Sequence, residues 1–169
     1  TLERMAFSPV ISDGFDRASG IYHKTNGEVI MQGPRGLPSF IYVMEFTTRT
    51  VIERIEDIAP GDIFIVNDPY LGGTHLMDVK MVKPFFYKGN LPAFLANSGH
   101  WTDIGGRVVG GFSTKATEIY QEGLRLPPIR FCDQGTLNKE VLDIILHNVR
   151  IPEERRGDLI AQVTSLNLG

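Results

Sequence analysis

The sequence predicts an α+β fold, in which a mixed, largely antiparallel β-sheet is accompanied by one helix in the N-terminal half and two C-terminal helices. Three observations predict it. Strand-like apolar runs alternate with turn residues between 20 and 131, apolar residues follow helical spacing over 38–58, and helical spacing returns after residue 137. We expect a single domain over residues 1–169, because the chain shows no repeat or low-complexity linker and its 42% hydrophobic content is enough for one core.

The first predicted elements are a hairpin and a helix. Residues 21–24 and 28–31 flank Asn26-Gly27, a pair that favours a tight turn with positive backbone dihedrals. From 38 to 58 one apolar stripe recurs at three- and four-residue steps, and Pro60-Gly61 then marks a turn. The stripe consists of Ile41, Met44, Thr48, Val51, Ile52 and Ile55.

The next predicted elements are strands that lead to polar motifs. Residues 63–66 are all apolar and typical of a buried strand that ends at Asn67. Residues 79–87 and 91–96 form a strand pair around a glycine turn, and the second of them leads to His100. Two strand ends can therefore converge on one site.

The remaining chain is predicted to be a loop, an extended segment and two helices. Glycines cluster between 105 and 123, which favours a loop that approaches a ligand or another backbone closely. Two prolines make 126–131 extended, and helical periodicity covers 137–149 and 152–168, with Pro152 suited to a first helical turn.

Composition excludes several classes of function. Seventeen basic and twenty acidic residues give a net charge of −3, so no electrostatic footprint for nucleic acid is present. No apolar run approaches the roughly 20 residues of a membrane span, and the first residues lack the pattern of a signal peptide. We therefore expect a cytoplasmic protein or a portion of a longer cytoplasmic polypeptide. The single cysteine, Cys132, excludes an internal disulfide and a thiolate-rich zinc site.

Two His-x-x-Asp patterns are the strongest indication of chemistry. His75 and Asp78 follow Gly72-Gly73, and His100 and Asp103 precede a second glycine pair. Imidazole and carboxylate are ligands for divalent first-row metals, and such a set can keep a coordination position open. Residues three apart share a face only if the chain turns, so we expect a turn after the glycines. The alternative is that these are ordinary loop residues that bond to nearby backbone.

Other candidate residues have a more ordinary interpretation. His23 and His147 are expected to be structural or solvated, and Cys132 a half-buried small residue. Neither glycine pair continues into a P-loop or a dinucleotide fingerprint, so independent nucleotide hydrolysis is not expected. Two further sets of residues remain open. A polar set either positions a substrate or forms a solvated face, and the sequence favours the solvated face; it consists of Glu118, Gln121, Glu122 and Arg125. An aromatic set either favours an aromatic or cyclic substrate or belongs to the core; it consists of Phe15, Tyr70, Trp101 and Phe112.

At these motifs the chain resembles the hydantoinase B family, which includes B-type subunits of N-methylhydantoinase, the corresponding half of 5-oxoprolinase, and subunits of acetone and acetophenone carboxylases. The similarity runs in one order along nearly the whole chain. Its main segments are Asn67-Asp68-Pro69-Tyr70-Leu71-Gly72-Gly73-Thr74-His75-Leu76-Met77-Asp78, His100-Trp101-Thr102-Asp103-Ile104-Gly105-Gly106, Glu118-Ile119-Tyr120-Gln121-Glu122-Gly123-Leu124, Pro127-Pro128, Asn148-Val149-Arg150-Ile151-Pro152 and Gly157-Asp158-Leu159-Ile160-Ala161-Gln162.

The resemblance implies a divalent metal held by His75, Asp78 and His100, with a fourth ligand at Asp13, where Asp16 competes. Manganese, zinc and iron are the candidate ions, and Asp103 would orient a ligand from outside the coordination shell. The resemblance also implies a partner, a hydantoinase A-type subunit that uses ATP to activate a small-molecule substrate. That substrate is either a cyclic amide, which is hydrolysed, or a ketone, which is carboxylated.

Family members are usually much longer, so this chain resembles the N-terminal, metal-bearing portion of one or a separate small subunit. The remaining B-type polypeptide or further subunits would then be additional partners. Two alternatives stay open: a non-catalytic assembly subunit that retains the fold, and a metal-dependent hydrolase that acts alone.

Overall fold

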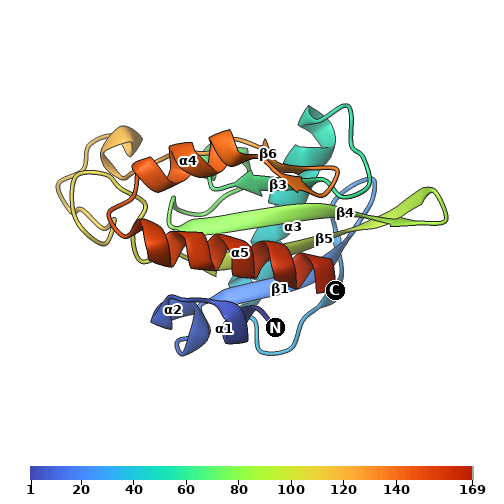
Figure 1. Cartoon of the computed structure of the whole chain (residues 1–169), viewed down its shortest axis with the longest axis horizontal. Helices are drawn as coiled ribbons and strands as arrows, with labels where there is room; N and C mark the ends of the chain where they lie inside the picture. The colour runs from blue at the N-terminus through green and yellow to red at the C-terminus, as the bar shows by residue number, and fades with distance from the viewer. Residues whose placement is uncertain (169) are drawn as a thin grey trace.

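The computed structural model describes residues 1–168 and is organised around one sheet with helices on both faces (Figure 1). Seven strands lie in the order β2-β1-β5-β4-β3-β6-β7, and every neighbouring pair is antiparallel. The predicted α+β class with a largely antiparallel sheet is confirmed. The strands are β1 (Arg17–His23), β2 (Val29–Gln32), β3 (Ile63–Val66), β4 (Asp78–Tyr87), β5 (Asn90–His100), β6 (Ile129–Asp133) and β7 (Thr136–Leu137); the helices are α1 (Leu2–Met5), α2 (Pro9–Ser12), α3 (Pro38–Arg54), α4 (Lys139–His147) and α5 (Pro152–Leu168), with 3-10 turns η1 (Pro69–Leu71) and η2 (Ile119–Gln121).

Helix α3 covers one face of the sheet alone. Its buried stripe, which includes Met44 and Val51, packs against Phe64, Val82 and Phe94 of the sheet. The helix ends at Arg54, four residues before the predicted end, and Ile55 is extended. Continuing it would place two acidic residues at the negative end of the helix dipole, which disfavours carboxylates.

The other face is covered by α4 and α5, with the short α1 and α2 beside them (Figure 1). Helix α5 has the predicted bounds and buries Leu159 and Leu166. Helix α4 begins two residues later than predicted, because the preceding residues pair with β6 and Asn138 caps the helix by accepting hydrogen bonds from two amides of its first turn. Among residues 1–168, no helix has the length and apolar character needed to cross a bilayer.

Strands β1 and β5 are longer than predicted. Strand β5 continues through Asn97, Ser98 and Gly99 to His100. Strand β1 begins at Arg17, which pairs with Gly99 of β5. These polar and small residues do not form an apolar pattern, but they pair with neighbouring strands on both sides. Between Trp101 and Pro128 the only regular element is η2, as expected for the glycine-rich segment.

Candidate metal centre

Three strands place the candidate site at one end of the sheet. Asp78 is the first residue of β4 and pairs with His100, the last residue of β5. Asp16 immediately precedes β1, and its carbonyl accepts a hydrogen bond from the amide of His100 (3.0 Å). Because β1 and β4 both run antiparallel to β5, their starts lie beside its end.

The turn that carries His75 is anchored to the rest of the fold at two points. The buried side chain of Asn67 donates a hydrogen bond to the carbonyl of Leu76 (2.7 Å). Gly72 adopts a left-handed conformation (φ 87°), and its carbonyl accepts a hydrogen bond from the Thr47 hydroxyl of α3. The chain therefore turns after the glycine, as expected, and brings His75 back toward the start of β4.

The carboxylate of Asp78 joins two imidazoles. Its Oδ1 lies 3.0 Å from Nδ1 of His100, and its Oδ2 lies 3.4 Å from Nε2 of His75. Ligand atoms from the three residues all lie within 4.8 Å of one another. Asp78 is buried, whereas the side chain of His75 is 40% exposed, so the cluster is open to solvent at His75.

The protonation states suit metal binding. Burial raises the pKa of Asp78, but hydrogen bonds from His100 and Thr74 lower it more, so the carboxyl is held ionised below its usual range. Burial lowers the pKa of His75 and outweighs the attraction of Asp78, which keeps the imidazole neutral near pH 7. Its Nδ1 is buried and has no hydrogen-bond partner within the described residues. Deprotonated ligands of this kind are what a divalent ion requires.

A buried lysine is linked to the Asp78 carboxylate through hydrogen bonds. Lys80 lies two residues after Asp78 in β4, so the two side chains share one face of the sheet. Its Nζ donates to the Thr74 hydroxyl (3.1 Å) and to the Asp78 carbonyl (3.2 Å), and Thr74 in turn donates to the Asp78 carboxylate. Burial lowers the pKa of Lys80 to about 8. This chain of donors fixes the orientation of the Asp78 carboxylate.

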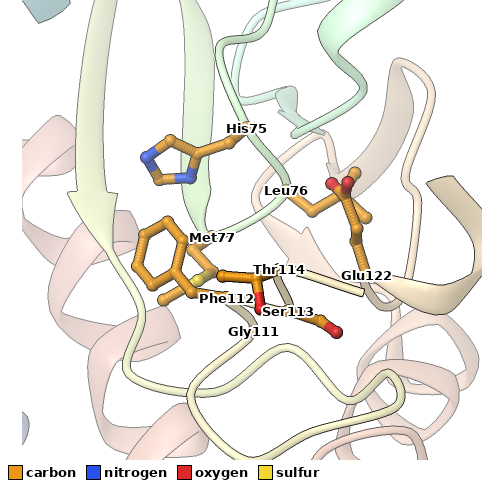
Figure 2. Close-up of a pocket in the computed structure, with 8 residues that line it drawn as sticks. All are labelled: His75, Leu76, Met77, Gly111, Phe112, Ser113, Thr114 and Glu122. Atoms are coloured by element: carbon orange, nitrogen blue, oxygen red, sulfur yellow. The ribbon is translucent and has the colours of Figure 1, made fainter. Parts of the chain in front are cut away.

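The glycine-rich segment places Phe112 over both imidazoles. The ring of Phe112 stacks on His100 (centroids 6.3 Å apart, 15° between planes) and meets His75 edge to face (5.7 Å). Gly110 and Gly111 precede it with φ values of 82° and 71°, a conformation that favours glycine. Figure 2 shows the Phe112 ring beside His75, and both residues line a cavity.

Of the two carboxylates considered as fourth ligand, Asp16 lies beside the cluster. Its Oδ2 is 3.7 Å from Nδ1 of His100. Burial raises the pKa of Asp16. The attraction of His100 lowers this pKa in part, and the negative charge of Asp78 raises it further. Asp13 is exposed at the end of α2, and its carboxylate accepts a hydrogen bond from the Ser12 hydroxyl (3.2 Å). The sequence favoured Asp13 as the fourth ligand, whereas Asp16 is the carboxylate that lies near His100 in the structure.

Asp103 has partners different from those expected. We expected it to orient a metal-bound imidazole, but one oxygen accepts from the amides of Gly105 (3.1 Å) and Arg150 (2.8 Å), and the other accepts from the Arg150 guanidinium (2.7 Å). Arg150 also donates to the carbonyls of Gly105 and Gly106. Asp103 therefore ties the start of the glycine-rich segment to the α4–α5 connection.

The other candidate residues lie outside the cluster. The His23 ring is hydrogen-bonded to the Thr25 hydroxyl (2.9 Å), and the His147 ring to the Asp143 carbonyl one turn earlier in α4 (2.7 Å). Both contacts are local ones. Cys132 is buried, and burial raises the pKa of its thiol. Arg125 pairs with Asp68 (3.3 Å), so it serves the fold of the turn.

Two residues of the site, Thr74 and Lys80, were missed by sequence reasoning. A strand beginning at Asp78 would have placed Lys80 on the same face by alternation, but the predicted strand began one residue later. Thr74 carries no such signal, because its contact depends on the shape of the turn. Of the aromatic candidates, Trp101 is fully buried in the core and Phe112 lies at the site.

Comparison with known proteins identifies the family to which this chain belongs. Residues 1–169 match the family Hydantoinase B/oxoprolinase. The caprolactamase subunit beta of Pseudomonas jessenii is 37% identical over 172 residues, which cover 100% of this chain and 29% of that protein. The crystal structure of the ATP-dependent caprolactamase from Pseudomonas jessenii superposes with a TM-score of 0.77 at 37% identity, covering 90% of this chain and 26% of that one. A nucleotide-free acetone carboxylase structure shares the fold, with a TM-score of 0.89 at 20% identity over 99% of this chain and 22% of that one.

Proposed function

Because the chain belongs to the hydantoinase B/oxoprolinase family, we propose that it is the metal-binding catalytic part of an ATP-dependent enzyme complex. The substrate would be an activated cyclic amide that is hydrolysed or a ketone that is carboxylated. The observation that carries the proposal is the cluster of His75, Asp78 and His100, whose ligand atoms lie within 4.8 Å of one another.

The partners of this chain follow from its relatives. Three of its relatives, a caprolactamase, a hydantoinase and an acetophenone carboxylase, are described as subunits, and the chain spans only 29% of the length of the caprolactamase and hydantoinase subunits. We therefore propose two partners: further B-type polypeptide, and a hydantoinase A-type subunit that hydrolyses ATP.

Each residue of the cluster has a distinct task in this proposal. His75, Asp78 and His100 would hold a manganese, zinc or iron ion, with Asp16 as the fourth ligand. A bound divalent ion supplies a Lewis acid for a carbonyl oxygen or lowers the pKa of water. Lys80 and Thr74 keep the Asp78 carboxylate in one orientation. Phe112 packs against both imidazoles and would limit how they reorient.

Elemental analysis of the purified chain tests the proposal. Near-stoichiometric metal is expected in the wild type and its loss in His75→Ala and His100→Ala, because each removes one of three ligands. His23→Ala is the matched control, since that imidazole lies in the β1–β2 hairpin and, among residues 1–168, bonds only to Thr25. If the wild type binds no manganese, zinc or iron, a non-catalytic assembly subunit becomes the better explanation. Activity of the isolated chain without ATP would instead favour a hydrolase that acts alone.

A further inference from the structure

A row of buried polar side chains runs along the face of α5 that lies on the sheet. Arg155, Asp158 and Gln162 are three and four residues apart, so they share one face of the helix, and all three are fully buried. Helix α5 extends along β4 and β5, the two strands that carry Asp78 and His100 at their ends (Figure 1). Because burial of a polar group is costly unless the group is hydrogen-bonded, the partners of this row show what it holds in place.

Gln162 connects the two strand ends that carry Asp78 and His100. Its Nε2 donates a hydrogen bond to the carbonyl of Val79 (2.9 Å), the residue after Asp78. Its Oε1 accepts a hydrogen bond from Nε1 of Trp101 (3.3 Å), the residue after His100. One side chain is therefore bonded to the immediate neighbours of two proposed metal ligands.

The Asp78 side chain itself lies on the opposite side of the sheet from α5. Val79 packs in the same core cluster as Leu159 of α5, whereas Val82 packs in the cluster that includes α3. Because side chains alternate along a strand, Asp78 shares the α3 side with Val82. Gln162 approaches from the α5 side, so it acts on Asp78 through the backbone and not by direct contact.

Asp158 extends the same arrangement to Asp16. Its Oδ1 accepts hydrogen bonds from the amides of Phe7 (2.8 Å) and Ser8 (3.0 Å), where α2 begins. The carbonyl of Val10 in α2 accepts in turn from the amide of Asp16 (3.0 Å). Helix α5 is thus bonded, directly or through α2, to residues at the starts of β1 and β4 and at the end of β5.

Apolar packing alone would hold α5 on the sheet without fixing the strand ends. Leu159 and Leu166 of this helix are buried, but apolar burial is non-directional, whereas hydrogen bonds require a defined geometry. The paired region of β4 and β5 ends at Asp78 and His100, and the ends of regular elements open more readily than their centres. Hydrogen bonds at this point restrict the strand ends where the site needs them restricted.

We propose that Gln162 is a positioning residue for the metal centre. By bonding to both Val79 and Trp101 it fixes the separation of Asp78 and His100 and so the geometry that a bound ion meets. This inference rests on the proposed function, since it assigns Gln162 to the ligands of that site.

Titration with Co²⁺ tests the proposal, because the visible absorption of this ion reports the geometry of its ligands as well as the amount bound. Gln162→Met removes both hydrogen bonds and keeps a side chain of similar length. We expect its Kd for Co²⁺ to rise by about tenfold, the lower end of the range for groups that support metal ligands, and the spectrum of the saturated site to shift. Partial loss of the fold would lower the fraction of chain that binds but would not alter the spectrum of the bound ion.

Ser165→Ala is the matched control. The Ser165 hydroxyl belongs to the same buried network, since it accepts a hydrogen bond from Nδ2 of Asn97 (2.7 Å). Among residues 1–168, however, no hydrogen bond joins its side chain to Val79 or Trp101. Its Kd and spectrum should equal those of the wild type.

A second variant keeps the test decisive if Gln162→Met does not fold. Trp101→Phe removes the Nε1 donor of the same link, and a wild-type spectrum in this variant would overturn the inference. A wild-type Kd and spectrum in Gln162→Met, or an equal change in Ser165→Ala, would overturn it as well. If the wild type binds no Co²⁺, the metal site itself is contradicted, and with it the role of Gln162. A wild type that binds and a Gln162→Met that behaves identically contradict the role of Gln162 alone.

Discussion

Each oxygen of the Asp78 carboxylate faces a different imidazole, and this single residue determines the spacing of the site. Oδ1 meets His100 and Oδ2 meets His75. Thr74 also donates to this carboxylate, and Lys80 donates to the Thr74 hydroxyl. A carboxylate with this many donors has little rotational freedom. The pair of imidazoles is therefore positioned before any ion binds, which reduces the entropic cost of coordination.

The position of Asp16 leads to a prediction about metal affinity. Asp16→Asn is expected to weaken metal binding by about 10–100-fold, the range seen when supporting groups of metal sites are removed, because its carboxylate lies 3.7 Å from His100. Asp13→Asn should leave the affinity unchanged. Competition with a chromophoric chelator measures both variants under the same conditions. The opposite ranking would restore Asp13 as the fourth ligand.

The hydrogen bonds of Asp103 predict how stability depends on pH. Burial raises the pKa of Asp103, but hydrogen bonds from Arg150 and Gly105 lower it more, so the folded state has the lower pKa. Stability from this group is therefore present above the pKa of the unfolded chain, about 3.9, and is lost as pH falls through the folded pKa. Asp103→Asn should cost about 1.5–3 kcal/mol at pH 7 and reduce this acid dependence.

Urea unfolding of the wild type and Asp103→Asn between pH 2.5 and 7 measures this effect. The two free energies of unfolding should approach each other as the pH falls. Arg150→Met, which removes the donor and keeps the apolar stem, should behave like Asp103→Asn near neutral pH. A constant difference across the whole range would show that Asp103 contributes packing rather than charge.

At the scale of elements, the turn between β3 and β4 depends on close contact with α3. Gly72 has φ 87°, and a Cβ built there would lie 2.6 Å from backbone atoms of Phe46 and Thr47. Gly89, in the β4–β5 turn, has a similar φ of 79°, but no atom of the described residues lies within 4 Å of its Cβ position. The two glycines therefore separate the cost of a left-handed conformation from the cost of a steric clash.

Gly72→Ala is expected to destabilise the fold by more than about 3 kcal/mol, since backbone strain and overpacking each cost about 1–3 kcal/mol. Gly89→Ala should cost only about 1–2 kcal/mol, the strain of the left-handed region alone. Chemical denaturation of both variants gives the comparison. Equal costs would mean that the turn moves away from α3 without penalty.

Elements with a local signal were predictable, and elements defined by distant partners were not. The apolar run of β3 and the proline-initiated α5 gave correct bounds. The polar end of β5 was missed because its strand conformation comes from pairing with β1, more than sixty residues earlier in the chain. For the same reason the sequence grouped His75, Asp78 and His100, which lie together in the structure, but gave no sign of the contact between Asp103 and Arg150, a residue of the α4–α5 connection.

At the scale of the whole molecule, metal binding and folding should be coupled. An ion that binds only the folded chain stabilises it by about 2.7 kcal/mol at a free concentration one hundred times Kd. For a chain of this size that corresponds to a rise in Tm of roughly 5–11 °C. Thermal unfolding with added manganese or zinc should show this rise in the wild type and its loss after chelation. His75→Ala should show no rise, and a rise equal to that of the wild type would contradict the site.

The order of the strands also implies an order of assembly. His75, Asp78 and His100 belong to one stretch that closes through the short β4–β5 turn, so they can meet at the rate of hairpin formation. Asp16 reaches them only when β1 docks on β5, a step that closes a much longer loop. A nascent chain would thus acquire a partial ion-binding hairpin early and complete the site late. Asp16 would then affect how long the ion is retained more than how fast it is captured.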